Sequence, residues 1–65
     1  MTIKEARIAA RYSQEAAARK LGISRPTYKR LEEHPELVKI GQAQAIADLF
    51  GVSLDELFFL EAYYK

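Results

Sequence analysis

Three basic side chains lie within six residues near the middle of this 65-residue chain: Arg25, Lys29 and Arg30. If this stretch is helical, Arg25 and Lys29 lie four residues apart on one face of the helix, and Arg30 directly follows Lys29. A guanidinium can donate paired hydrogen bonds to a phosphate or to O6 and N7 of guanine, and an ammonium binds phosphate as a point charge. The types and spacing of these residues therefore indicate a surface that binds a polyanion.

The distribution of charge along the chain supports the same interpretation. The whole chain has a formal net charge of only +1. Residues 1–30 carry eight basic groups against two acidic groups, a net charge of +6, whereas residues 31–65 carry two basic groups against seven acidic groups, a net charge of −5. Such asymmetry is typical of nucleic-acid binding by one half of a protein. The alternative is that these basic residues only cover solvent-exposed helix faces and have no function. Charge alone does not decide between nucleic-acid binding and this alternative.

Composition argues against several other functions. The chain has no cysteine and one histidine, His34, so we expect no metal site and no cofactor. Glu32 and Glu33 are adjacent, and adjacent helical residues do not face each other, so we expect no catalytic residue and no enzyme activity. We interpret His34, which precedes a proline, as a turn residue. No small-molecule ligand is evident.

No apolar run reaches the roughly 20 residues that span a bilayer, and a signal-peptide core is lacking. We therefore expect a soluble cytoplasmic protein with one all-α domain over residues 1–65. The pattern predicts five helices. The first covers about residues 3–11 and is capped by a Thr2–Glu5 capping box, and the second covers residues 14–21 and is capped by Ser13. The third extends from Ser24 to His34-Pro35, and the fourth covers residues 40–50. The fifth begins at the Ser53–Glu56 capping box and continues through Leu57 and beyond.

Gly22 and Pro26 mark a join between two short helices. A glycine just past a helix adopts the left-handed conformation at low cost, and a proline in the first turn breaks no intrahelical hydrogen bond. The apolar side chains of both helices, Tyr28 among them, fall on the faces that meet each other and the remaining core. This pattern predicts a helix-turn-helix, whose second helix projects far enough to enter a DNA major groove about 12 Å wide.

Two separated blocks of sequence carry a resemblance to the lambda-repressor-like (XRE, Cro/CI-type) family of helix-turn-helix DNA-binding domains. The resemblance covers residues 3 to about 58, and the second block begins 19 residues after Glu32. The blocks are Gln14-Glu15-x-x-Ala18-x-x-x-Gly22-Ile23-Ser24-x-x-Thr27-Tyr28-x-x-x-Glu32 and Gly51-Val52-Ser53-Leu54-Asp55-Glu56-Leu57.

The resemblance implies a role for each matching position. Arg7 and Glu32 match two positions that pair across the core, which is an architectural role. The matching base-reading positions are Arg25, Pro26, Lys29 and Arg30. The matching phosphate-binding positions are Gln14, which would also brace the reading helix, Ser24, Thr27, Lys39, Ile40 and Gly41. Pro26 would read only by shape, Lys29 could contact a base or a phosphate, and a non-specific phosphate contact is the alternative for each basic residue.

Two departures from the family pattern matter. Relatives often have an Asn-Gly-Lys loop after the glutamate, but this chain has Glu33-His34-Pro35-Glu36. Either this acidic loop points away from DNA, or it lowers the affinity. In addition, Lys39 stands where a small capping residue commonly begins the fourth helix, and its charge could replace the role of that cap.

The last residues are rich in aromatic side chains, with Phe58, Phe59, Tyr63 and Tyr64 as candidate interface residues. Residues 59–65 could pack on their own domain, form a homodimer contact or bind another protein. The sequence as a whole predicts a sequence-specific double-stranded DNA-binding transcription regulator. A repressor is favoured, acting on a palindromic operator as a homodimer, at the nucleoid of a bacterium or phage-infected host. The alternative is an antitoxin-like or phage-encoded protein-binding module that uses the aromatic tail.

Overall fold

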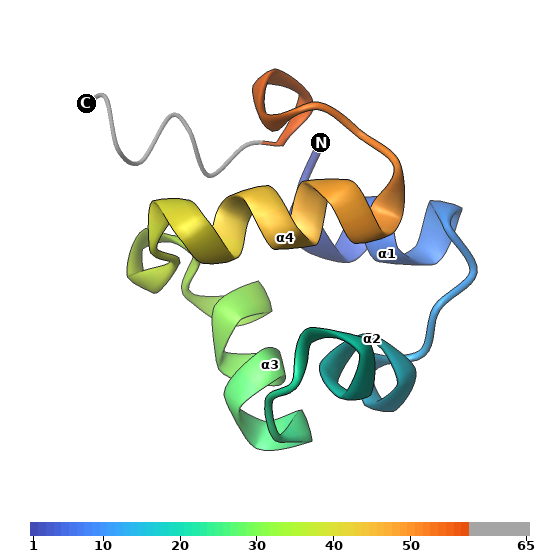
Figure 1. The fold of residues 1–65 in the computed structure, drawn as a ribbon, viewed down its shortest axis with the longest axis vertical. Helices are drawn as coiled ribbons and strands as arrows, with labels where there is room; N and C mark the ends of the chain where they lie inside the picture. The colour runs from blue at the N-terminus through green and yellow to red at the C-terminus, as the bar shows by residue number, and fades with distance from the viewer. Residues whose placement is uncertain (58–65) are drawn as a thin grey trace.

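The computed structural model describes residues 1–57, and these residues form helices and turns without a strand (Figure 1). Residues 58–65 lie outside the described part, and with them the interface predicted at Phe58, Phe59, Tyr63 and Tyr64. No helix within residues 1–57 is long and apolar enough to cross a membrane. The elements in chain order are α1 (Ile3–Ala9), α2 (Gln14–Leu21), α3 (Arg25–Glu33), the 3₁₀ turn η1 (Pro35–Leu37), α4 (Ile40–Phe50) and the 3₁₀ turn η2 (Leu54–Glu56).

The starts of the first two helices follow from side chains that satisfy free backbone N–H groups. Thr2 Oγ1 accepts from the N–H of Glu5 at 3.0 Å, while the Glu5 carboxylate accepts from the N–H of Thr2 at 2.7 Å. Ser13 Oγ accepts from the N–H of Ala16 at 3.0 Å and begins α2. These contacts confirm the predicted caps, each of which stabilises its helix by about 1 kcal/mol.

The join between α2 and α3 also forms as predicted. Gly22 ends α2 with φ +73° and ψ +27°, the left-handed conformation that glycine adopts without a Cβ clash. Ser24 then caps α3, and Pro26 lies in its first turn. The helix ends at Glu33, because the residue before Pro35 is pushed out of the helical region, and His34 has φ −133°. α2 and α3 pack against each other around this turn.

The prediction of five helices is wrong, since the described residues hold four α-helices. The N–H of Ser53 does donate to the Glu56 carboxylate at 2.8 Å, but only the single 3₁₀ turn η2 follows. Leu57 then has extended backbone angles, φ −93° and ψ 132°, and its side chain is 1% exposed. Leu57 is therefore buried with extended backbone angles at a position where the sequence predicted helix.

Two smaller differences concern α1 and α4. α1 ends at Ala9, two residues before the predicted end, and Arg11 has φ +64°, a left-handed conformation that is costly for a residue with a Cβ. Ile40 is the first residue of the helix predicted over residues 40–50, yet it is 61% exposed. Val38, two residues earlier, is 1% exposed and fills the interior at this end of the helix.

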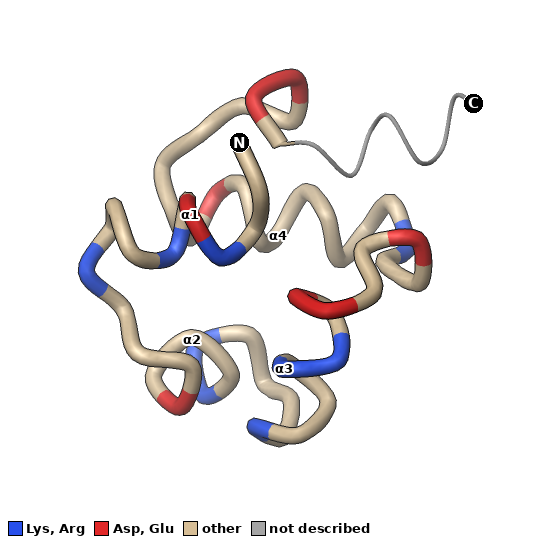
Figure 2. The backbone as a smooth tube through the Cα atoms, turned by 180° about the vertical axis from the view of Figure 1, so that it is seen from behind, with Lys and Arg blue, Asp and Glu red and all other residues tan. Residues whose placement is uncertain are grey.

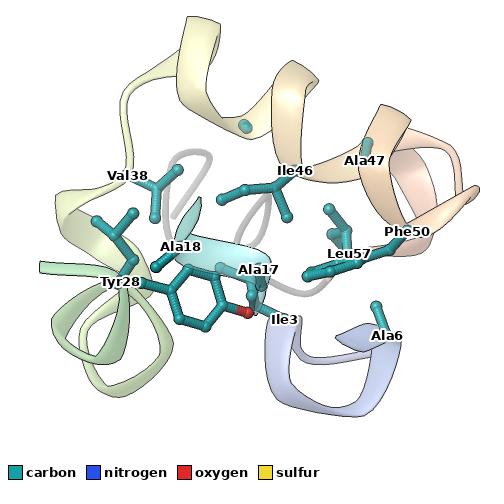
Figure 3. Packing of buried hydrophobic residues seen from close by; sticks show 12 residues of the cluster. Ile3, Ala6, Ala17, Ala18, Tyr28, Val38, Ile46, Ala47, Phe50 and Leu57 are labelled. Carbon is teal, nitrogen blue, oxygen red and sulfur yellow. The ribbon is translucent and has the colours of Figure 1, made fainter. Parts of the chain in front are cut away.

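The core lies between α4 and the other helices (Figure 3). α4 packs against α1 and α2, whereas α3 packs mainly against α2 and η1 and so lies at the edge of the domain. Small residues permit close approach where α2 enters the core. The buried apolar residues are Ile3, Ala6, Ala17, Ala18, Tyr28, Leu31, Val38, Ala43, Ile46, Ala47, Phe50 and Leu57.

Candidate nucleic-acid interface

α3 has a buried face and an exposed face. Tyr28 is fully buried and Leu31 is 6% exposed, and both anchor the helix to the core. The side chains between these two anchors point to solvent. The exposed residues of α3 include Arg25, Pro26, Thr27, Lys29 and Arg30. Within residues 1–57 none of the three cations forms a salt bridge, so their N–H donors remain open to a ligand.

A buried polar network holds α3 against the first two helices. The Arg7 guanidinium donates from Nε to Glu32 Oε2 at 2.6 Å and from Nη1 to the carbonyl of Tyr12 at 2.9 Å. Gln14 Nε2 donates to Glu32 Oε1 at 3.1 Å. The Glu32 carboxylate, whose side chain is 4% exposed, thus joins α1, the start of α2 and the end of α3. No residue type or spacing in the sequence indicates that the carbonyl of Tyr12 accepts a hydrogen bond from Arg7, and this contact was not predicted.

This network determines the charge state of Glu32. Burial alone would raise the pKa of the carboxyl, but hydrogen bonds from Arg7 and Gln14, together with the nearby Tyr28 hydroxyl, outweigh burial and lower the pKa. Burial, followed by the neighbouring Glu32 carboxylate, raises the pKa of Tyr28 above its usual range. Among residues 1–57 no group has the geometry to hydrogen-bond the Tyr28 hydroxyl. Glu32 is therefore ionised and Tyr28 neutral near pH 7.

Gln14 stands at the first position of α2 with its side-chain amide directed to Glu32. The bracing contact implied by the family resemblance is therefore present in the structure. Since Ser13 Oγ accepts only from Ala16, the backbone N–H groups of Gln14 and Glu15 lack intrahelical partners. A phosphate at this helix end would meet those N–H groups and the positive end of the helix dipole.

Ser24 and Thr27 lie together at the exposed start of α3. Ser24 Oγ accepts from the N–H of Thr27 at 3.2 Å and donates to Thr27 Oγ1 at 2.8 Å. The Thr27 hydroxyl therefore already accepts one hydrogen bond and keeps its own proton to donate. The structure places this donor on the same helix turn as Arg25 and Pro26, where a phosphate could accept it.

Lys39, Ile40 and Gly41 form the exposed start of α4. Gln42 Oε1 accepts from the N–H of Lys39 at 3.0 Å, whereas a lysine side chain offers no acceptor for the first-turn N–H groups. The N–H groups of Ile40 and Gly41 therefore lack a cap, and the Lys39 ammonium adds a positive charge beside them. This end of α4 has the donors and the charge that suit a phosphate.

The acidic residues after Glu32 do not point away from the basic face. Glu33, His34 and Glu36 line the same open hollow as Lys29 and Arg30. In Figure 2 the red end of α3 lies next to the blue of α3. The acidic loop therefore borders two of the candidate base-reading side chains, Lys29 and Arg30.

Comparison with known proteins agrees with this arrangement. A family model described as helix-turn-helix matches residues 3–57. The match begins at the first residue of α1 and ends at the buried Leu57, so it covers all four α-helices and both 3₁₀ turns. Neither a curated protein nor a solved structure matches the chain.

Proposed function

Since the chain belongs to this lambda-repressor-like helix-turn-helix family of DNA-binding regulators, we propose that it is a sequence-specific transcriptional repressor. In this proposal residues 1–65 act as one DNA-binding domain and α3 lies in the major groove of double-stranded DNA. Arg25 and Arg30 donate to guanine O6 and N7, Lys29 contacts a base or a phosphate, and Pro26 contacts a base by shape.

Two helix ends and one hydroxyl would fix the position of α3 by binding phosphates. They are the start of α2 at Gln14, the start of α4 at Lys39, Ile40 and Gly41, and the Thr27 hydroxyl, which Ser24 orients. Contacts of this kind set register and orientation without reading sequence. The family's usual phosphate contacts from α4 remain compatible with Lys39 at its cap, because the ammonium supplies charge and the first-turn N–H groups stay free.

The observation that carries the proposal is the division of α3 into two faces. Its inner face is buried and tied through Glu32 to Arg7 and Gln14, so the helix is held rigidly. Its outer face presents Arg25 and Arg30 without an ion-pair partner among residues 1–57. A rigid helix with unpaired guanidinium groups supports base recognition, which needs donors at fixed positions.

Repression would follow from occupancy alone, since a protein bound across a promoter blocks RNA polymerase without a further surface. We propose that two copies bind the halves of a palindromic operator, with half-site centres about 34 Å apart, one helical turn. The protein would then act at the nucleoid, in the cytoplasm of a bacterium or phage-infected host.

Selection of binding sites from random duplexes tests this function. Arg25→Ala and Arg30→Ala should each relax preference at one base pair, by about 1–3 kcal/mol of discrimination. Lys4→Ala, which removes the same charge from the exposed side of α1, should retain the wild-type preference. Base reading by α3 is ruled out if both arginine variants select the wild-type sequence.

The salt dependence of affinity tests the role of the phosphates separately. Several phosphate contacts make the affinity fall steeply with salt, with a logarithmic slope of about −0.9 per contact. A flat slope without sequence preference would instead favour the protein-binding alternative.

A further inference from the structure

The corner between α3 and η1 brings three titratable side chains beside the candidate base-reading face. We call Glu33, His34 and Glu36 the acidic corner. α3 ends at Glu33, and the chain turns at His34-Pro35 instead of continuing away from the helix. As a result the acidic corner lines one open hollow together with Pro26, Lys29, Arg30 and Leu37. A phosphate that approaches Lys29 or Arg30 in this hollow also approaches the acidic corner.

The charges in the hollow balance only when His34 is neutral. Lys29 and Arg30 from α3 supply two positive charges, and Glu33 from α3 and Glu36 from η1 supply two negative charges. His34 Nδ1 lies 3.3 Å from Glu36 Oε2, and both side chains are more than half exposed. Within residues 1–57 neither Glu33 nor Glu36 forms another salt bridge. A proton on His34 would therefore offset Glu36 and leave the hollow with a net positive charge.

We infer that the acidic corner is a pH-dependent brake on DNA binding. This inference rests on the proposed function, because it assumes that α3 enters the major groove. When His34 is neutral, Glu33 and Glu36 repel the phosphates that flank the groove and offset the attraction of Lys29 and Arg30. When His34 is protonated, it pairs with Glu36 and the repulsion weakens. Histidine is the side chain that ordinarily changes charge between about pH 5 and 8.

The sign and size of the effect follow from electrostatics. Protonation adds a positive charge near an anionic ligand, so affinity for DNA should rise as the pH falls. In water and at low salt, a unit charge several ångströms from a phosphate changes the affinity by about 3-fold, and salt reduces this effect. Because phosphates are present in every duplex, the brake should act on operator and random DNA alike, and base preference should stay unchanged.

The test measures the binding of the full chain to fluorescently labelled duplexes of about 25 base pairs, which is more than two helical turns. One duplex has mixed sequence and one carries the selected operator. Dissociation constants are measured at about pH 7.5 and about pH 5.5 at low salt, because histidine side chains ordinarily change charge in this range. His34→Gln removes the proton site, His34→Lys keeps a positive charge at both pH values, and Glu36→Gln removes the partner. Circular dichroism confirms that each variant is folded.

The wild type should bind about 3-fold more tightly at the lower pH, and His34→Gln should lose most of this change. His34→Lys should bind at the higher pH as tightly as the wild type does at the lower pH. Glu36→Gln should bind more tightly than the wild type at the higher pH, on both duplexes. If His34→Gln keeps the pH dependence of the wild type, or if Glu36→Gln leaves affinity unchanged, the brake is refuted.

Failure of the brake differs from failure of the proposed function. If the wild type binds DNA in an Arg25- and Arg30-dependent manner but the corner variants behave as the wild type, only the brake is wrong. If the wild type binds neither duplex at either pH, the proposed function and the pH-dependent brake are both refuted.

Discussion

Replacing Glu32 by glutamine removes the charge that joins three helices while nearly preserving the shape of the side chain. In the wild type the Glu32 carboxylate accepts from Arg7 at 2.6 Å and from Gln14 at 3.1 Å. The Arg7 side chain is 11% exposed, and its other hydrogen bond goes to the neutral carbonyl of Tyr12. The Glu32→Gln variant therefore leaves a guanidinium in the interior without an opposing charge.

The expected cost is large relative to the stability of so small a domain. Removing one partner of a buried ion pair typically costs about 3–5 kcal/mol. At roughly 0.05–0.15 kcal/mol per residue, a chain of this length has about 3–10 kcal/mol of stability in total. We expect a loss at the lower end, about 3 kcal/mol, because the amide oxygen of the substituted side chain can still accept one hydrogen bond from Arg7. The variant should be marginally stable at 25 °C.

Urea denaturation followed by circular dichroism measures this loss. With a slope of about 1 kcal/mol per molar urea for a small domain, the midpoint should fall by about 3 M. Glu15→Gln is the matched control, because Glu15 pairs with Arg19 at 3.5 Å and both side chains are largely exposed. It should cost less than about 0.5 kcal/mol. Equal losses in the two variants would refute the assignment of Glu32 as the anchor of α3.

Three further perturbations test other parts of the fold. Gly22→Ala should lower the free energy of unfolding by about 1–2 kcal/mol through its left-handed backbone alone, since no atom lies within 4 Å of the added Cβ. Gly41→Ala has equal space but lies within α4, so it should raise the free energy of unfolding by about 0.5–1 kcal/mol. Chemical denaturation compares the two variants. Tyr28→Phe should change the free energy of unfolding by less than about 1 kcal/mol, because removing a buried hydroxyl without a hydrogen-bond partner among residues 1–57 is favourable, whereas losing its effect on the Glu32 carboxyl is unfavourable. A change of about 2 kcal/mol or more in thermal denaturation would contradict this. Because the pKa of Glu32 is lowered in the folded state, the ionised Glu32 carboxylate stabilises the fold above its unfolded pKa near 4.5, and this stabilisation is lost as the pH falls below that value. Acid titration should therefore show a smaller loss of stability for Glu32→Gln than for the wild type. An equal loss of stability would exclude Glu32 as the source of the acid sensitivity.

The helices with strong local signals could be predicted from the sequence. Ser13, Ser24 and Gly22 act on backbone groups within four residues, so their effects depend little on the rest of the fold. The fifth helix could not be predicted correctly, because the burial of Leu57 competes with the local capping box and depends on the assembled core. The left-handed backbone at Arg11 has no local signal either, since that conformation usually indicates glycine.

The candidate site shows the same limit. The cations of α3 and the Arg7–Glu32 pair could be identified from residue types and from the family resemblance. The direction of the acidic loop could not, because it depends on how His34-Pro35 turns the chain after α3. The Tyr12 carbonyl was also missed, since every residue has a carbonyl and only the folded chain selects one as a partner.

The two faces of α3 also bear on how this protein can change over generations. Folding depends on Tyr28, Leu31 and Glu32, while the solvent-facing positions, Arg25 and Arg30 among them, contribute little to packing. Mutations at the outer positions can therefore accumulate at low cost to the fold. A gene duplicate could thus acquire a new target by changing only the outer positions of this nine-residue helix, while its inner positions keep the scaffold intact.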